Sequence, residues 1–204
     1  MSNLWYSCVT PRLGFGTLLV MSRIKVGVIR GGPSSEYDVS LQTGAAVLKH
    51  LPEKYESADI FIDKKGVWYT RGLQTAPDRV LPHLDVAFIA LHGRYGEDGQ
   101  IQKMLETHHV PYVGSESLPS AMGLNKHLAK EVFKKQGLRV PYHTLLRRGE
   151  LNERQIVEAY RHIPQPSVLK PVDGGSSLGV YLARSFFEFK KALKNAAIHS
   201  PTVL

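Results

Sequence analysis

The chain has 204 residues, 43% of them hydrophobic and 22% charged, and its 26 Lys and Arg against 18 Asp and Glu give a net charge of +8. This composition is typical of a globular protein, and no apolar run approaches the ~20 residues of a membrane span, so no membrane partner is expected. A single cysteine, Cys8, excludes an internal disulfide framework and indicates a reducing, cytoplasmic location.

The positive charge suits anionic partners such as nucleotides. Nucleic acid is not expected, because the basic residues are spread along the chain and no RNP or helix-turn-helix signature accompanies them. A missing acidic segment would explain the charge equally well, since the metal-binding carboxylates of a nucleotide enzyme would lie there.

Residues 1–21 differ from the rest and show no clear hydrophobic period. We predict a disordered or loosely attached extension, with Met21 as the native start. A cleaved leader is the alternative, although the charge and cleavage pattern of a signal peptide are poorly formed.

From Ile24 onward, strand and helix patterns alternate. The predicted strands cover 24–29, 55–62, 85–91 and 110–114, a short hairpin arm covers 66–69, and helices cover 39–51 and 100–108. This rhythm predicts a doubly wound parallel-sheet domain over residues 22–120. Ligands of such sheets bind beyond the carboxyl ends of the strands, where the Gly-rich loops 31–36 and 92–99 lie.

After residue 120 the pattern predicts a second, incomplete α+β domain over 121–204. Its predicted helices cover 125–136, 152–162 and 185–199, with Asn152 and Ser185 as N-caps, and its strands cover 141–146, 167–170 and 178–183. Residues 201–204 begin a further strand with no later segment to pair with, which suggests an interrupted domain.

The stretch from Lys170 to Gly179 is the most informative motif. A β-type run delivers a lysine to a Gly/Ser loop, whose N–H groups and hydroxyls can wrap an anion while Lys170 supplies a point charge. It is not a Walker A loop, because its lysine precedes the glycines. We interpret it as a nucleotide-phosphate cradle in which Gly175, Ser176, Ser177 and Gly179 contact the phosphates.

The two earlier loops carry the other candidate groups. Glu36 either stabilises the helix start through the helix dipole or receives the ammonium group of a substrate. His92 and the glycines beside it are interpreted as functional, whereas Glu97 and Asp98 are interpreted as caps of the next helix.

The lysines and the other histidines have plainer interpretations. Lys126, alone on its helix, would by default face solvent, and Lys130, Lys134 and Lys135 look like a solvated face. A metal site combining His92 with His108 and His109 lacks supporting carboxylate spacing, so no metal ligands are assigned.

Four blocks in register resemble the D-alanine–D-alanine ligase family, ATP-grasp enzymes of cell-wall precursor synthesis. Residues 31–40 match G-G-x-S-x-E-x-x-V-S, residues 92–106 match H-G-x-x-G-E-D-G-x-x-Q-x-x-L-E, residues 111–126 resemble P-Y-x-G…S-A…M-D-K, and residues 170–179 match K-P-x-x-x-G-S-S-x-G. The resemblance begins near residue 22 and runs to the end of the chain.

The resemblance implies a reaction and roles for the matched residues. ATP would phosphorylate one D-alanine to an acyl phosphate, which the amine of a second D-alanine attacks. Glu36 would hold the ammonium of the first D-alanine, His92 would lie beside its carboxylate, and Ser176 would hydrogen-bond toward Glu36. Lys126 and Lys170 would hold ATP phosphates.

The resemblance also implies motion, metals and assembly. The cradle, residues 174–179, would close as a lid that excludes water. Mg²⁺ or Mn²⁺ would serve the full-length enzyme, with ligands outside this chain, and relatives form homodimers largely through the first domain.

Departures from the family pattern shape the remaining expectations. Asn125 stands where the family has Asp, and the family's adenine-binding hinge, an Arg that steadies the intermediate and the metal ligands have no counterpart here. We therefore expect a fragment without ligase activity alone. The alternatives are a D-alanine–D-lactate or D-alanine–D-serine ligase, or a non-catalytic binding module. The joint presence of Glu36, His92, Lys126, Lys170 and Ser176 argues against the module.

Overall fold

The first part of the molecule is built on a sheet of mostly parallel strands. The computed structural model describes residues 23–150 and 152–204. Its parallel strands are β1 (Ile24–Gly31), β2 (Tyr55–Ile62), β5 (Val86–Ile89) and β6 (Tyr112–Val113), and its antiparallel edge is the hairpin of β3 (Trp68–Thr70) and β4 (Leu73–Thr75). The order is β4-β3-β2-β1-β5-β6.

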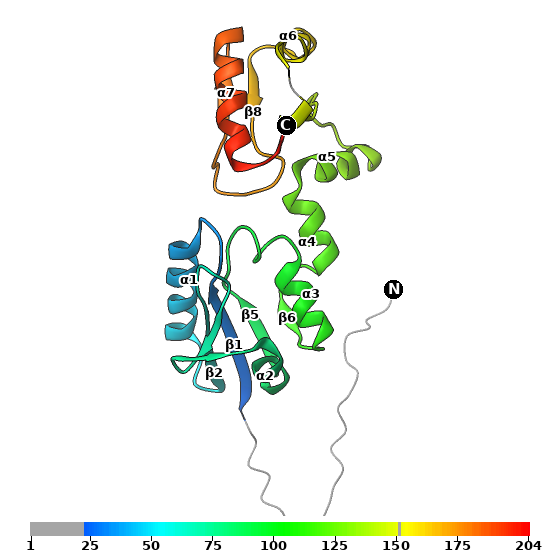
Figure 1. The fold of residues 1–204 in the computed structure, drawn as a ribbon. Helices are drawn as coiled ribbons and strands as arrows, with labels where there is room; N and C mark the ends of the chain where they lie inside the picture. Colours follow the sequence, from blue (N-terminus) through cyan, green and yellow to red (C-terminus); the bar gives the residue numbers. More distant parts are fainter. Residues whose placement is uncertain (1–22, 151) are drawn as a thin grey trace, which may run out of the picture.

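Helices cover both faces of this sheet (Figure 1). On one face, α1 (Tyr37–His50) packs over Val26 and Val28 of β1. On the other, α2 (Pro77–Val80), the 3₁₀ turn η1 (Leu81–His83) and α3 (Gln100–Thr107) enclose the larger core around Ile29. β1 is apolar toward both layers, as a central parallel strand must be. The predicted doubly wound α/β class is confirmed.

Ser40 fixes the loop after β1. Its buried hydroxyl accepts a hydrogen bond from the N–H of Gly31 at 2.7 Å and donates to the carbonyl of Ala90 at 2.8 Å. One side chain at the start of α1 thus joins the carboxyl ends of β1 and β5. The loops that follow these two strands therefore lie side by side.

The second part of the molecule lies beyond the carboxyl ends of these strands (Figure 1). The chain reaches it through α4 (Ser117–Leu124) and α5 (Lys126–Lys135). It continues through β7 (Leu146–Arg147), η2 (Arg148–Glu150), α6 (Glu153–His162), β8 (Ser167–Leu169), β9 (Tyr181–Ala183), α7 (Phe186–His199) and β10 (Thr202–Val203). The α+β character expected here is confirmed.

A separate core holds this second part together, with Phe189 of α7 fully buried at its centre. Asn152 forms a capping box with Gln155 at the start of α6, and Ser185 accepts from the N–H of Glu188 at the start of α7. Both predicted caps are confirmed. β8 pairs with β9, and β7 pairs with β10, each antiparallel.

Several expectations need correction. The predicted strand 141–146 is reduced to Leu146–Arg147, because only these residues meet β10. The segment 201–204 does have partners: it pairs with β7, and Leu204 exchanges backbone hydrogen bonds with Lys170. The sequence did not indicate α4, and the predicted domain boundary after residue 120 falls inside this helix.

Two further expectations concern the N-terminal extension and membrane-spanning segments. The predicted extension 1–21 lies outside the described residues. Within the described ranges, no helix combines the length and apolar character that crossing a bilayer requires.

Candidate active site

A small pocket forms where three loops meet. It has a volume of about 180 Å³ and lies between the loop after β1, the loop after β5 and the Gly/Ser loop between β8 and β9. Its lining residues are Pro33, Ser34, Ser35, Glu36, Gly93, Arg94, Pro171, Asp173, Gly174, Gly175, Leu178 and His199. The structure therefore brings together three loops that the sequence singled out separately.

Glu36 lines this pocket and contacts Ser176, although 140 positions separate the two residues. Ser176 Oγ donates a hydrogen bond to Glu36 Oε1. Glu36 stands at the N-cap of α1, yet its side chain makes no capping hydrogen bond. The carboxylate is turned to the pocket instead of the helix, which favours the substrate interpretation over the dipole one.

Two glycines leave room for the Glu36 carboxylate. A Cβ on Gly93 would lie 2.4 Å from Glu36 Oε2, and a Cβ on Gly175 would lie 3.3 Å from the same atom. Gly93 also has a φ of 69°, in the left-handed region. A side chain at position 93 would therefore strain the backbone and collide with the carboxylate.

The Gly/Ser loop adopts a left-handed path over two non-glycine residues. Ser176 and Ser177 have φ values of 49° and 58°, which are uncommon for residues with a Cβ. Such conformations cost of order 1–3 kcal/mol each and persist only when the surroundings hold them. Here the Ser176–Glu36 hydrogen bond and a short turn from the N–H of Leu178 to the carbonyl of Gly175 (3.1 Å) hold the loop.

An ion pair that sequence reasoning missed also spans the pocket. Arg94 Nη2 pairs with Asp173 Oδ2, and the Ser200 hydroxyl donates to Asp173 Oδ1 at 2.6 Å. Burial raises the pKa of the Asp173 carboxyl, but the Ser200 hydrogen bond and the Arg94 charge outweigh it and hold the pKa below its ordinary value. Arg94 and Asp173 both lie within family motifs given above, but at positions where the motif allows any residue.

His92 lies beside the pocket and not in its lining. Its backbone carbonyl accepts from Ser34 Oγ at 2.7 Å, its Nε2 lies 2.9 Å from Thr43 Oγ1, and its Nδ1 lies 3.5 Å from Glu97 Oε1. Both ring nitrogens are thus engaged. Glu97 pairs with His92 and does not cap α3, contrary to expectation, whereas Asp98 does accept from the N–H of Gln100 at 3.1 Å.

A lysine cluster (Lys126, Lys130 and Lys170) lies next to the Gly/Ser loop. Lys126 Nζ donates to the carbonyl of Gly174 at 2.7 Å. Burial and the charge of Lys170 lower the pKa of both Lys126 and Lys130, and Asp173 partly opposes this at Lys126. Lys130 is therefore part of the cluster, and its interpretation as a solvated surface residue is wrong.

A cavity of about 440 Å³ adjoins this cluster in the second part of the molecule. Lys130 and Lys170 line it together with Phe189, Leu169 and several prolines. Apolar walls with ammonium groups at one side suit a planar base joined to phosphates. The described residues thus fit a nucleotide.

The same region does not fit the expected Mg²⁺. The carboxylates that line the small pocket are Glu36, which holds Ser176, and Asp173, which holds Arg94 and Ser200, and the larger cavity has no acidic lining residue among those described. Mg²⁺ needs oxygen ligands in octahedral geometry.

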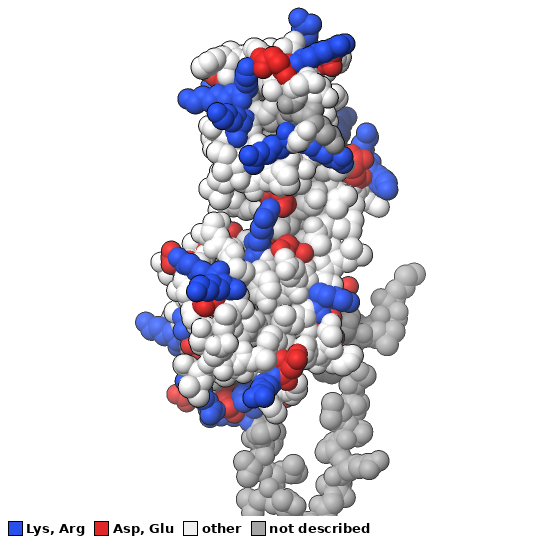
Figure 2. All heavy atoms as spheres, viewed as in Figure 1, with Lys and Arg blue, Asp and Glu red and all other residues white. Residues whose placement is uncertain are grey.

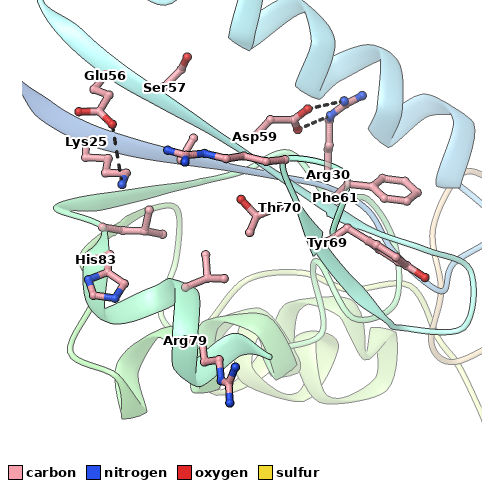
Figure 3. Close-up of a pocket in the computed structure, with 15 residues that line it drawn as sticks. Lys25, Arg30, Glu56, Ser57, Asp59, Phe61, Tyr69, Thr70, Arg79 and His83 are labelled. Atoms are coloured by element: carbon pink, nitrogen blue, oxygen red, sulfur yellow. Dashed lines mark hydrogen bonds and ion pairs between the residues drawn. The ribbon is translucent and has the colours of Figure 1, made fainter. Parts of the chain in front are cut away.

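A larger cavity lies elsewhere and does not involve these loops. It measures about 780 Å³ and is formed by β2, the β3–β4 hairpin and the α2–η1 segment (Figure 3). Its charged groups include two ion pairs, Arg30 with Asp59 at 2.7 Å and Lys25 with Glu56 at 3.8 Å. Because none of the three motif-bearing loops contributes a lining residue to this cavity, the smaller pocket is the better candidate site.

Charge on the surface is mixed. On the face shown in Figure 2, Lys and Arg side chains are scattered over both parts of the molecule, with Asp and Glu side chains among them. The net charge of +8 is therefore not gathered into one stripe on this face.

Comparisons with known proteins show what this chain is similar to. The family model described as "D-ala D-ala ligase N-terminus" matches residues 25–81 and 70–115. The D-alanine–D-alanine ligase of Geobacter sulfurreducens is 40% identical over 181 residues, which are 88% of this chain and 53% of that protein. That of Anaeromyxobacter dehalogenans is 38% identical, over 88% of this chain and 55% of that protein.

Solved structures give the same result. The VanG D-Ala:D-Ser ligase from Enterococcus faecalis aligns with a TM-score of 0.77 and 28% identity, over 89% of this chain and 62% of that one. The D-alanine–D-alanine ligase from Bacillus anthracis aligns with a TM-score of 0.73 and 32% identity, over 88% and 56%. This chain spans about half the length of the curated relatives it matches. From its sequence, its fold and its loop motifs, the chain belongs to the D-alanine–D-alanine ligase family.

Proposed function

We propose that the chain supplies the first-substrate and phosphate sites of an ATP-dependent D-alanine–D-alanine ligase that serves peptidoglycan precursor synthesis. The observation that carries the proposal is the contact of Ser176 with Glu36, which lines a pocket of about 180 Å³ next to the lysine cluster. A pocket of this size accepts a small amino acid. The cavity of about 440 Å³, which adjoins the three ammonium groups of the lysine cluster, accepts a nucleotide with its phosphates.

Each residue has a task that follows from its charge and place. Glu36 receives the ammonium of the first D-alanine, and Ser176 holds Glu36 oriented toward it. His92 acts from beside the pocket, toward the substrate carboxylate. Lys126 and Lys170 contact the phosphates together with Gly175, Ser177 and Gly179, and the lysine charges offset the charge that develops on the transferring group.

The reaction proposed is a ligation through an acyl phosphate. ATP transfers its γ-phosphoryl group to the carboxylate of the first D-alanine, so that an O–P bond to the carboxylate forms, the bond to the β-phosphate breaks and ADP leaves. The amine of the second D-alanine then attacks the acyl carbon, so that a C–N bond forms, the C–O bond to phosphate breaks, phosphate leaves with the electron pair and the amine gives up a proton. The loop of residues 174–179 covers the pocket and keeps water from the labile acyl phosphate.

The expected domain division, oligomeric state and location are also part of this proposal. We propose a domain of residues 22–120 followed by a partial domain of residues 121–204, a homodimer and a cytoplasmic location. The D-alanine–D-lactate and D-alanine–D-serine alternatives use the same first substrate, so a test with D-alanine addresses what they share.

The test measures D-alanine binding to the chain by NMR titration. Glu36→Gln keeps the shape of the side chain but removes its charge, and it should weaken D-alanine binding at least tenfold, because the substrate ammonium loses its counter-charge. The matched control is Glu53→Gln, at an exposed position outside the pocket. Equal D-alanine affinities in the two variants would contradict the assignment of Glu36.

A further inference from the structure

A second group of chemistry-bearing side chains lies apart from the pocket. His127 and Glu131 stand one turn apart on the same face of α5, and His143 comes from the segment that leads to β7. One donor atom from each residue lies within 4.8 Å of the other two. All three residues are half-buried, and none of them has a task in the ligase reaction proposed above.

The spacing of these atoms is that of a metal site. His127 Nδ1 lies 3.3 Å from His143 Nε2, and His143 Nε2 lies 3.6 Å from Glu131 Oε1. Zinc bonds to nitrogen and oxygen at about 2.0–2.2 Å in tetrahedral geometry, which separates neighbouring ligand atoms by about 3.3–3.6 Å. One ion placed here would match both spacings to His143 Nε2, and the donor atoms of His127 and Glu131, which lie within 4.8 Å of one another, would close on it.

The surroundings prepare His143 to act as a ligand. Its Nδ1 faces the carbonyl of Pro141 at 3.4 Å, and its side chain is only 14% exposed. A backbone carbonyl at Nδ1 favours the tautomer whose Nε2 carries the lone pair, as is common for metal-bound histidine. That lone pair then faces His127 and the Glu131 carboxylate, so three acceptors converge on a space that a shared cation would fill.

The donor set also selects the kind of ion. Two imidazoles and one carboxylate suit Zn²⁺, whereas Mg²⁺ and Ca²⁺ require oxygen ligands. The start of α5 by itself disfavours a cation, and the Glu131 charge compensates for this. We propose that His127, Glu131 and His143 form a Zn²⁺ site that fastens α5 to the segment before β7. Water would complete the tetrahedron.

The site has a structural consequence for its neighbours. Lys130 lies on the same helix, and His143 itself lines the larger cavity. A Zn²⁺ ion here would fix two walls of that cavity relative to one another. The proposal requires no nucleotide and no D-alanine, so it stands independently of the ligase function.

The test uses the full chain, stripped with a chelator and then dialysed against Zn²⁺ with excess Mg²⁺. We expect one Zn²⁺ per chain by elemental analysis. With Co²⁺ in place of Zn²⁺, we expect the visible absorption of a four-coordinate ion. His143→Ala and Glu131→Gln should each lower the Zn²⁺ affinity at least tenfold, and the control His50→Ala, at an exposed position at the end of α1, should not.

Two results would overturn the proposal. Either the unaltered chain retains no Zn²⁺, or His143→Ala and His50→Ala retain the same amount. Circular dichroism checks that the variants fold. Should His143→Ala unfold, the imidazole NMR signals of the unaltered chain still decide the matter, because Zn²⁺ must shift those of His127 and His143 and leave that of His50 unchanged.

Discussion

Gly93→Ala tests whether the position of the Glu36 carboxylate controls substrate binding. The substitution adds one methyl group, and a Cβ at this position would lie 2.4 Å from Glu36 Oε2. The oxygen must retreat by about 1 Å to reach an ordinary contact of 3.4 Å. Such a shift moves the carboxylate off its hydrogen bond with Ser176, and a displacement of this size is enough to affect function strongly.

The same substitution also strains the backbone, and this effect has to be separated from the first. Gly93 has a φ of 69°, and an alanine in the left-handed region costs roughly 1–2 kcal/mol. Gly66→Ala is the matched control, because Gly66 has a φ of 84° and a Cβ there would meet nothing within 4 Å. Both variants should therefore lose a similar free energy of unfolding, measured in urea.

D-alanine affinity, measured by NMR titration, should then distinguish the two variants. Gly66→Ala should bind D-alanine as the unaltered chain does. Gly93→Ala should bind it about tenfold more weakly, which corresponds to 1.4 kcal/mol. If both variants bind D-alanine equally well, the carboxylate of Glu36 is not the group that holds the substrate.

Three further predictions concern charge, a buried hydroxyl and a helix cap. The lowered pKa of Lys126 means that ATP binding should restore its charge and take up a proton at pH values between that lowered pKa and 10.5. This uptake is measured as a heat of binding that depends on the buffer. Lys126→Met should reduce the uptake, while the exposed control Lys134→Met should not. Ser40→Ala should lower the free energy of unfolding by about 1–3 kcal/mol, because a buried N–H and a buried carbonyl lose their hydrogen-bond partner. The control Thr107→Ala, at an exposed position, should lower it far less in the same urea titration. Asn152→Ala should cost about 1 kcal/mol through the lost capping box, and a change below the error of the measurement would show that α6 does not need its cap.

Most of the fold could be predicted from local patterns in the sequence. The strand at 55–62 was predicted with the bounds it has, because turn residues mark its ends. Helices with a capping residue and a clear apolar stripe, such as α6 and α7, were also found. These features depend on neighbours within one or two turns, which the sequence displays directly.

Features that depend on distant partners were not predictable in this way. β7 has only two residues because β10, more than fifty positions later, is equally short. α4 carries Pro119 in its first turn, where proline is tolerated, and none of its residues is buried, so no stripe marks it. The Arg94–Asp173 pair joins positions 79 apart, and a sequence pattern does not say which loops will face one another.

The Arg94–Asp173 pair also makes the pocket sensitive to the medium. Its side chains are 53% and 33% exposed, so dissolved ions reach them, and at physiological ionic strength exposed charges are screened over about 8 Å. Rising ionic strength should weaken this link between the two parts of the molecule while leaving both apolar cores intact. The strength with which the loop after β5 is held to the Gly/Ser loop is then set partly by the salt around the protein and not by its own sequence alone.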